Sequence, residues 1–168
     1  DALGISRSNI YGITMPGFGT TDRTYTNALE MMKQLEITTH EIPIATAVLQ
    51  HFSDIGHDPA KHDVTYENSQ ARERTQILMD FANSKGAMVI GTGDLSELAL
   101  GWATYNGDHM SMYGVNGSVP KTLVKHLVIH EALATENEVV RNTLLDVVNT
   151  PISPELIPAA ADGTIKQK

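Results

Sequence analysis

The sequence predicts an α/β fold with a mainly parallel sheet, and two observations lead to this prediction. Short β-rich runs alternate with helix-period segments along most of the chain, which favours parallel strands joined by right-handed crossovers. The chain shows no internal repeat and no heptad run, and its 168 residues with 41% hydrophobic content suit one domain with a single core.

The first three elements precede residue 45. Residues 9–15 (NIYGITM) predict a strand that ends in the turn cluster PGFGTTD. Residues 20–36 predict a helix capped by Thr21 or Asp22, because apolar residues recur there with a helical period. Residues 37–44 (ITTHEIPI) alternate and predict a second strand.

The middle of the chain repeats this alternation. Residues 45–56 and 67–86 predict two helices, the second of which is stopped by Lys85-Gly86. The apolar run 87–91 (AMVIG) predicts a short strand, and a helix is expected from about Leu95 to Trp102.

Three further elements follow residue 109. Residues 110–115 (MSMYGV) predict a last short strand. Residues 119–133 predict a helix with proline in its first turn, and residues 137–149 predict another helix. In parallel sheets of this kind ligands bind beyond the carboxyl ends of the strands, so the loops at 15–22, 91–94 and 104–111 are the candidate walls of a site.

The composition excludes several classes of function. The chain has no cysteine, so it offers neither a disulfide framework nor a thiolate. Its net charge of −8 and pI of about 5.2 argue against a nucleic-acid surface. No run reaches the ~18 apolar residues of a membrane span. We therefore expect a reducing, cytoplasmic compartment and no nucleic-acid or membrane partner.

The stretch GTGDLSE (91–97) combines a strand end, two glycines and a helix start. Backbone N–H groups and the helix dipole would face a ligand there. A dinucleotide fingerprint needs a third glycine where Ser96 stands, which weakens that interpretation. Asp94 and Glu97 fit a capping box, and they also fit a Mg²⁺ site that uses carboxylates and phosphate oxygens.

The stretch ENSQARER places Asn68 and Arg72 one helical turn apart. The amide and the guanidinium could address one ligand, or they could belong to a solvated helix start. The aromatic residues Phe18, Trp102 and Tyr105 likewise could stack on a flat ring or fill the core.

Two pairs of histidines are considered as metal ligands, and neither pair matches a known metal-binding pattern. His126 and His130 lie at i and i+4, but their order differs from the His-Glu-x-x-His of metalloproteases. His57 and His62 lie in a loop beside acidic residues. The sequence places no third ligand for either pair, so histidine-bound metal is not predicted.

Four segments occur in a specific order: MPGFGTTDRTYTNA, ENSQARERTQILMD, GTGDLSELALGWATYNGDHMSMY and VPKTLV. Together they resemble the synthetase domain of NAD⁺ synthetase, most closely its glutamine-dependent branch. The resemblance covers nearly the whole chain. It implies an adenine nucleotide α-hydrolase-like fold of the N-type ATP pyrophosphatase group. It also implies a reaction in which ATP adenylates deamido-NAD⁺ and ammonia then gives NAD⁺, AMP and pyrophosphate.

The resemblance assigns roles to individual residues. The residues it implies for ATP are Thr92, Lys121 and, more loosely, Ser153. Those it implies for deamido-NAD⁺ are Asn68, Arg72, Glu97, Trp102, Ala103, Thr104 and Tyr105. Glu97 matches a Mg²⁺ ligand of the shorter members of the family. ATP and Mg²⁺ are thus the implied cofactors, and deamido-NAD⁺ and ammonia the implied partners.

The chain also departs from the family pattern. The phosphate loop Ser-Gly-Gly-x-Asp-Ser occurs nowhere in it, and Met112 stands where ammonia-dependent members carry an acid. A nitrilase-like glutaminase domain and a C-terminal closing segment are absent from these residues. We therefore expect residues 1–168 to be part of an NAD⁺ synthetase domain, with a flexible tail at 159–168 and little activity in isolation.

The family strand order 3-2-1-4-5 sets a further expectation. The strands at 9–15 and 87–91 lose a common neighbour, so they could pair directly, share a strand with a second copy, or receive a separate segment. Self-association as a homo-oligomer is expected.

Two rival interpretations stay open: a nucleotide-binding module of the same fold with different chemistry, and a non-catalytic fragment. The Trp102–Tyr105 stretch favours a nicotinate pocket over the first of these rivals.

Overall fold

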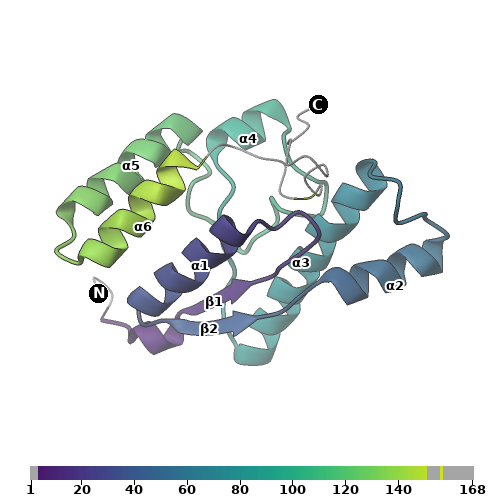
Figure 1. Ribbon diagram of the computed structural model, residues 1–168, viewed down its shortest axis with the longest axis horizontal. Helices are drawn as coiled ribbons and strands as arrows, with labels where there is room; N and C mark the ends of the chain where they lie inside the picture. The colour runs from purple at the N-terminus through teal and green to yellow at the C-terminus, as the bar shows by residue number, and fades with distance from the viewer. Residues whose placement is uncertain (1–3, 151–155, 157–168) are drawn as a thin grey trace. The chain divides into compact units, whose positions relative to one another are not determined.

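The computed structural model describes residues 4–150 and residue 156, which form helices and short parallel strands (Figure 1). The chain divides into two compact units. The first comprises the residues up to Pro43 and those from Lys125 onward, and the second runs from Ile44 to Val124. The predicted α/β class is confirmed by this alternation and by the parallel pairing of its strands.

The first unit contains a parallel strand pair and a crossover helix. Strand β1 (Tyr11–Thr14) pairs with β2 (Thr38–Glu41), and α1 (Asp22–Gln34) connects them. A Cβ on Gly12 would lie 2.8 Å from the Cδ1 of Ile37 and would also meet Met32, so this glycine lets the strand and the residues that cover it approach closely.

Helix α1 also packs against α6 (Glu138–Asn149) in the first unit. Each helix begins where a polar cap satisfies free backbone N–H groups. Thr21 accepts a hydrogen bond from the backbone of Thr24, and Asn137 accepts from the backbone of Val139 and Val140. The expected cap at Thr21 is thus confirmed.

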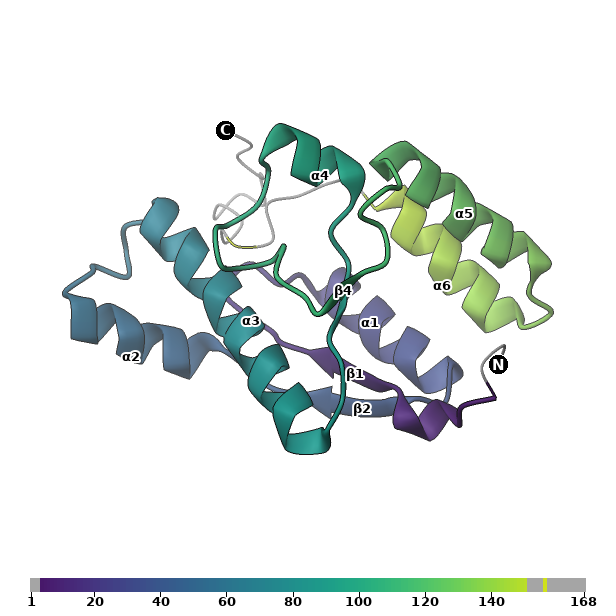
Figure 2. The ribbon, with the colours of Figure 1, turned by 180° about the vertical axis from the view of Figure 1, so that it is seen from behind.

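The second unit begins with a helical hairpin of α2 (Ala45–Ile55) and α3 (Val64–Lys85), seen in Figures 1 and 2. Both helices end at a glycine with positive φ, Gly56 and Gly86, as is typical of C-caps. The rings of Phe52 and Tyr66 stack between the helices with their centroids 5.6 Å apart. This apolar contact anchors the hairpin on which the residues of the candidate site depend.

The rest of the second unit builds a strand–helix–strand arrangement. Strand β3 (Ile90–Gly91) leads into α4 (Leu95–Leu100), and β3 pairs in parallel with β4 (Tyr113–Gly114). Figure 2 shows α4 and β4. Helix α5 (Lys121–Ala134) begins in this unit and continues into the first. Among the described residues, each unit thus has a two-stranded parallel sheet of its own.

Several element boundaries differ from the prediction. Helix α3 begins at Val64, three residues before the predicted start, because Asp63 caps the backbone of Thr65 and Tyr66. Helix α4 stops at Leu100 because Gly101 adopts φ 65°, so Trp102 lies outside it. A short 3₁₀ helix at Arg7–Asn9 was not predicted. The proposed tail at 159–168 lies outside the described residues.

Among the described residues, no helix combines the length and the apolar character that crossing a bilayer requires.

Candidate functional site

The carboxyl end of β3 opens onto a hollow within the second unit, hereafter the strand-end hollow. Its lining includes Gly91, Gly93 and Gly114 and the side chains of Glu97, Asp108 and His109. A Cβ on Gly91 would lie 2.7 Å from the Cβ of Ser111, so only glycine fits at this strand end. Loops 91–94 and 104–111, which were predicted to be walls of the site, thus both contribute residues to the strand-end hollow.

Asp94 and Glu97 form the capping box that the sequence allowed. The backbone N–H of Glu97 donates to Asp94 Oδ1 at 3.0 Å, and the backbone N–H of Asp94 donates to Glu97 Oε2 at 3.0 Å. This exchange uses only one carboxylate oxygen of Glu97. The other oxygen, Oε1, lies 3.0 Å from Lys121 Nζ. Capping and lining of the hollow are therefore two tasks of the same side chain.

The start of α5 is hydrogen-bonded to the start of α4. The backbone N–H of Lys121 donates to Ser96 Oγ at 3.1 Å, and that of Leu95 donates to the carbonyl oxygen of Val119 at 3.0 Å. Ser96, which breaks the dinucleotide pattern, is thus a structural acceptor. These bonds bring the ammonium of Lys121, predicted to contact ATP, to the edge of the strand-end hollow.

The loop of residues 102–109, hereafter the aromatic loop, begins at the left-handed Gly101. Its rings project outward: Trp102 is 74% exposed and Tyr105 is 75% exposed. The possibility that these two rings fill the core is therefore wrong in the described structure, whereas Phe18 is half-buried. Ala103 lines the strand-end hollow, so the loop runs from the hollow to an exposed aromatic surface.

Thr104 organises the aromatic loop from within. Its backbone N–H donates to Asp108 Oδ1 at 2.7 Å, and its carbonyl oxygen accepts from Gly107 N at 2.9 Å and from His109 Nδ1 at 2.8 Å. Because a carbonyl oxygen only accepts, Nδ1 of His109 is the donor in this contact.

Two side chains of α3 contact the same loop. Thr104 Oγ1 donates to Asn68 Oδ1 at 2.8 Å, and Arg72 Nε donates to the carbonyl oxygen of Tyr105 at 3.1 Å. Asn68 and Arg72 were predicted as ligand contacts or as a solvated helix start. In the described structure both side chains reach the aromatic loop, while Arg72 stays exposed and Glu67 lies in the first turn of α3.

The other two residues predicted to contact ATP are Thr92 and Ser153. Thr92 is exposed in the loop after β3, next to the glycines that line the hollow. Ser153 lies outside the described residues.

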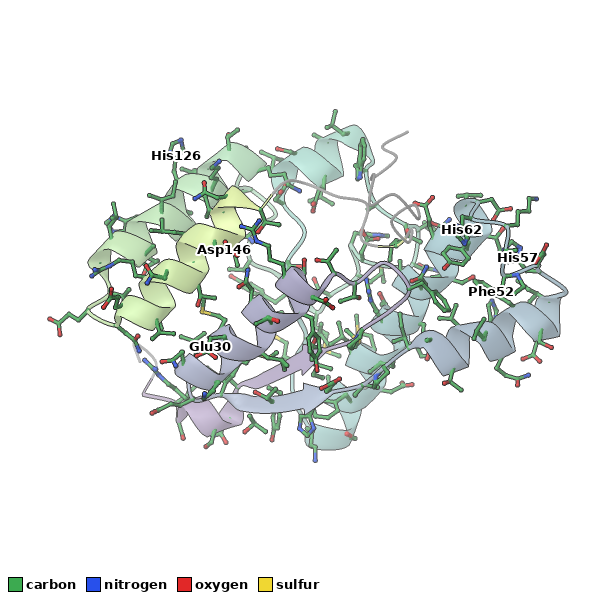
Figure 3. The ribbon with its side chains drawn as sticks, viewed as in Figure 1. Glu30, Phe52, His57, His62, His126 and Asp146 are labelled. Atoms are coloured by element: carbon green, nitrogen blue, oxygen red, sulfur yellow. The ribbon has the colours of Figure 1, made fainter. Side chains whose placement is uncertain are left out.

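The histidines lie elsewhere. His57 packs against Phe52 with ring centroids 4.8 Å apart, and His62 packs against Tyr66 at 4.5 Å (Figure 3). His126 lies on α5. Within residues 4–150 and 156, no three histidine, aspartate or glutamate side chains gather into a metal-binding group.

Sequence reasoning missed three contributors to the site. Asp108 and His109 line the hollow, and Ser96 receives the start of α5. The Asn106-Gly107 dipeptide was the available signal for a turn here, because Asn and Gly are the residues that favour tight turns.

The arrangement suits an anionic ligand with a flat ring. Glycine backbones and the ammonium of Lys121 can approach phosphate, carboxylates can bind a divalent cation, and exposed aromatic faces can stack on a pyridinium or purine.

Comparison with known proteins identifies the family. A family model described as NAD synthase matches residues 1–143. The glutamine-dependent NAD⁺ synthetase of Mycobacterium leprae is 46% identical over 172 residues, covering 99% of this chain and 25% of that relative. The enzyme of the same name from Acinetobacter baylyi is 33% identical, covering 96% of this chain and 29% of that relative.

Solved structures agree with this match. A glutamine-dependent NAD⁺ synthetase from Acinetobacter baumannii in complex with ADP superposes with a TM-score of 0.73 at 28% identity, over 79% of this chain and 26% of that one. An NMN synthetase from Francisella tularensis shares the fold, with a TM-score of 0.74 at 21% identity, over 87% and 56% of the two chains. The chain spans about a quarter of the length of the mycobacterial relatives it matches. It belongs to the NAD synthase family and has the adenine nucleotide α-hydrolase-like fold of its members.

Proposed function

We propose that the protein containing this chain makes NAD⁺ from deamido-NAD⁺, with ATP and with ammonia released from glutamine. The observation that carries the proposal is the convergence of Glu97, Lys121 and the aromatic loop on one strand-end hollow in a member of the NAD synthase family. The names of the relatives, and the ADP in one relative's structure, support the same reaction class.

The first step joins two anions. A carboxylate oxygen of the nicotinate attacks the α-phosphorus of ATP, and pyrophosphate leaves. Repulsion between the anions must be offset by positive groups held in place before the reaction. Lys121 is suited to a phosphate, and its pairing with Glu97 keeps its ammonium directed at the hollow. Thr92 lies at the strand end, where its hydroxyl can contact the nucleotide.

The residues present also fit Mg²⁺. Glu97 and Asp108 are two carboxylates that line the same hollow, and Mg²⁺ is commonly held by one or two carboxylates together with phosphate oxygens. When bound there, the cation would neutralise phosphate charge.

The second step is amidation. The nitrogen of ammonia bonds to the carbonyl carbon of the acyl adenylate, the bond from that carbon to the AMP oxygen breaks, and the nitrogen gives up a proton. No covalent bond to the protein is needed. The protein must hold the nicotinate in place, and the exposed rings of Trp102 and Tyr105, with Ala103 and Thr104 between them, are suited to that task.

The proposal also covers the source of ammonia, the oligomeric state and the cellular compartment of the protein. Ammonia from glutamine requires a glutaminase activity, which we assign to a nitrilase-like domain of the complete protein. We also propose that the protein is a cytoplasmic homo-oligomer. Sedimentation of the complete protein tests the last point, and a monomer at micromolar concentration would contradict it.

The central test supplies the complete protein with ATP, Mg²⁺ and glutamine, and with either deamido-NAD⁺ or nicotinic acid mononucleotide. The expected result is one NAD⁺ and one pyrophosphate per deamido-NAD⁺ consumed, with much slower turnover of the mononucleotide. Preference for the mononucleotide, or pyrophosphate release without NAD⁺, would contradict the proposal.

A further inference from the structure

We propose that Arg72, with Asn68, is a positioning residue that holds the aromatic loop in the shape that receives deamido-NAD⁺, and that its charge does not contact that ligand. The inference rests on the proposed function for its substrate. The contact between Arg72 and the loop is a property of the chain itself.

The two side chains reach the aromatic loop at consecutive residues. Asn68 accepts the hydroxyl hydrogen of Thr104, and Arg72 Nε donates to the carbonyl oxygen of Tyr105. Because Asn68 and Arg72 are one turn apart on α3, a single helix face fixes two adjacent points of the loop. A loop held at two neighbouring points keeps both its position and its direction.

The rest of the loop is already fixed from within. The N–H and C=O groups of Thr104 are bonded to Asp108, Gly107 and His109. A Cβ on Gly107 would lie 2.8 Å from the Cβ of Thr104, so the turn closes without space for a side chain there. These internal bonds close the turn, and the contacts with α3 hold the turn in its closed form.

Arg72 contacts the loop through Nε, so substitutions can test its hydrogen bond separately from its positive charge. Nε lies in the middle of the arginine side chain, three bonds from Cβ. A glutamine amide nitrogen lies at the same number of bonds from Cβ, so Arg72→Gln can keep this donor while it removes the charge. Lysine has a carbon at that place, so Arg72→Lys keeps the charge and loses the donor.

A positioning role and a charge-recognition role for Arg72 thus predict opposite rankings of Arg72→Gln and Arg72→Lys by their KM for deamido-NAD⁺. For a positioning residue, Arg72→Gln leaves the KM for deamido-NAD⁺ within about twofold of the wild type, while Arg72→Lys and Arg72→Met each raise it about tenfold, as loss of one hydrogen bond to a charged group predicts. The KM for ATP changes little in all three. For a charge that touches the ligand, Arg72→Lys would be the mildest variant, and this result would overturn the inference.

Lys85→Gln is the matched control, because it removes a positive charge from the far end of the same helix. It should leave both KM values unchanged. Combining Arg72→Lys with Trp102→Ala tests whether Arg72 acts through the loop. The combined variant should be little worse than Trp102→Ala alone, whereas full additivity of the two effects would contradict the inference.

A measurement without substrate separates this inference from the proposed function. In the complete protein, hydrogen exchange at the bonded amides of Thr104 and Gly107 should speed up in Arg72→Lys and Arg72→Met but not in Arg72→Gln. Unchanged exchange in all three would overturn the positioning role even if the enzyme makes NAD⁺. Failure to make NAD⁺ with the expected exchange pattern would overturn only the proposed function.

Discussion

Glu97 shows how one side chain can serve both the fold and the site. One oxygen closes the capping box with Asp94, and the other pairs with Lys121 at the strand-end hollow. The sequence pattern Asp-x-x-Glu predicted the cap, but it could not predict the pairing, because Lys121 is brought close only when α5 begins beside α4.

Glu97→Gln separates the two tasks. The amide oxygen can still accept from Asp94, so α4 should remain capped, while the charge facing Lys121 is lost. We expect NAD⁺ formation by the complete protein to fall at least ~100-fold, the scale for removing one preorganised electrostatic partner. A variant with normal activity would limit Glu97 to its capping role. Asp94→Ser, which keeps a capping side chain, is the control for α4.

Trp102 offers a second test at the scale of the residue. Because its side chain is 74% exposed, Trp102→Ala leaves no cavity and should not change the unfolding temperature. We expect the KM for deamido-NAD⁺ to rise about tenfold, as loss of a stacked aromatic ring predicts, with a smaller change for ATP. Steady-state kinetics with each substrate varied checks this. Equal effects on both substrates with a lowered unfolding temperature would indicate a structural role.

At the scale of the element, helices α1 and α6 are joined by a polar cluster formed by Arg23, Asn27 and Asp146. Arg23 Nε donates to Asp146 Oδ2 at 2.8 Å, Asn27 Nδ2 donates to the same oxygen at 2.6 Å, and an Arg23 Nη2 contact completes the ion pair. Figure 3 labels Asp146 on α6. The hydrogen bonds from Arg23 and Asn27, with the positive charge of Arg23, lower the pKa of Asp146 to about 2.

This pKa fixes the direction of a pH effect. A carboxyl group whose pKa is lowered by folding stabilises the folded state above its unfolded pKa of 3.8, and that contribution is lost as the pH falls toward 2. Asp146→Asn should therefore speed hydrogen exchange in α1 and α6 modestly, by about two- to threefold at pH 7, because the pair is exposed. The difference from the wild type should shrink as the pH falls from about 4 through 2.

Glu131→Gln on α5 is the control for this effect, since it removes an exposed carboxylate elsewhere in the same unit. It should leave exchange in α1 and α6 unchanged at every pH. A difference between Asp146→Asn and the wild type that does not shrink as the pH falls through 2 would show that the cluster acts through shape and not through charge.

Elements were predictable where local chemistry determines them. Gly86 ended α3 as expected, and Thr21 began α1. The end of α4 was missed because the aromatic and apolar pattern runs on past Gly101, whose left-handed backbone stops the helix. The reach of α3 to the aromatic loop could not be predicted from spacing, since Asn68 and Tyr105 meet only in the folded unit.

At the scale of the whole molecule, the candidate residues gather in one part of the chain. Every described residue that the resemblance assigns to ATP or deamido-NAD⁺ lies between Ile44 and Val124, which forms a compact unit, whereas the predicted wall at 15–22 belongs to the other unit. Most of these positions came from the resemblance to NAD⁺ synthetases. The residues alone left them divided between structural and ligand-binding roles.

This division predicts where ligands should slow exchange. Adding deamido-NAD⁺, a nonhydrolysable ATP analogue and Mg²⁺ to the complete protein should protect residues 91–121 and the first half of α3. Helix α6, which belongs to the other unit, should serve as an unchanged internal reference. Protection strongest in α6, with none at 91–121, would contradict the placement of the site.

The construction of the aromatic loop has a practical consequence for enzyme engineering. Its internal bonds all converge on Thr104, and its turn requires Gly107, but Tyr105 is fixed through its backbone carbonyl and its ring extends into solvent. A library that varies residue 105 while it keeps residues 104, 107, 108 and 109 therefore changes the chemistry presented to a substrate without changing the bonds that close the loop. Residue 105 is the position at which we would begin a search for acceptance of altered pyridine dinucleotides.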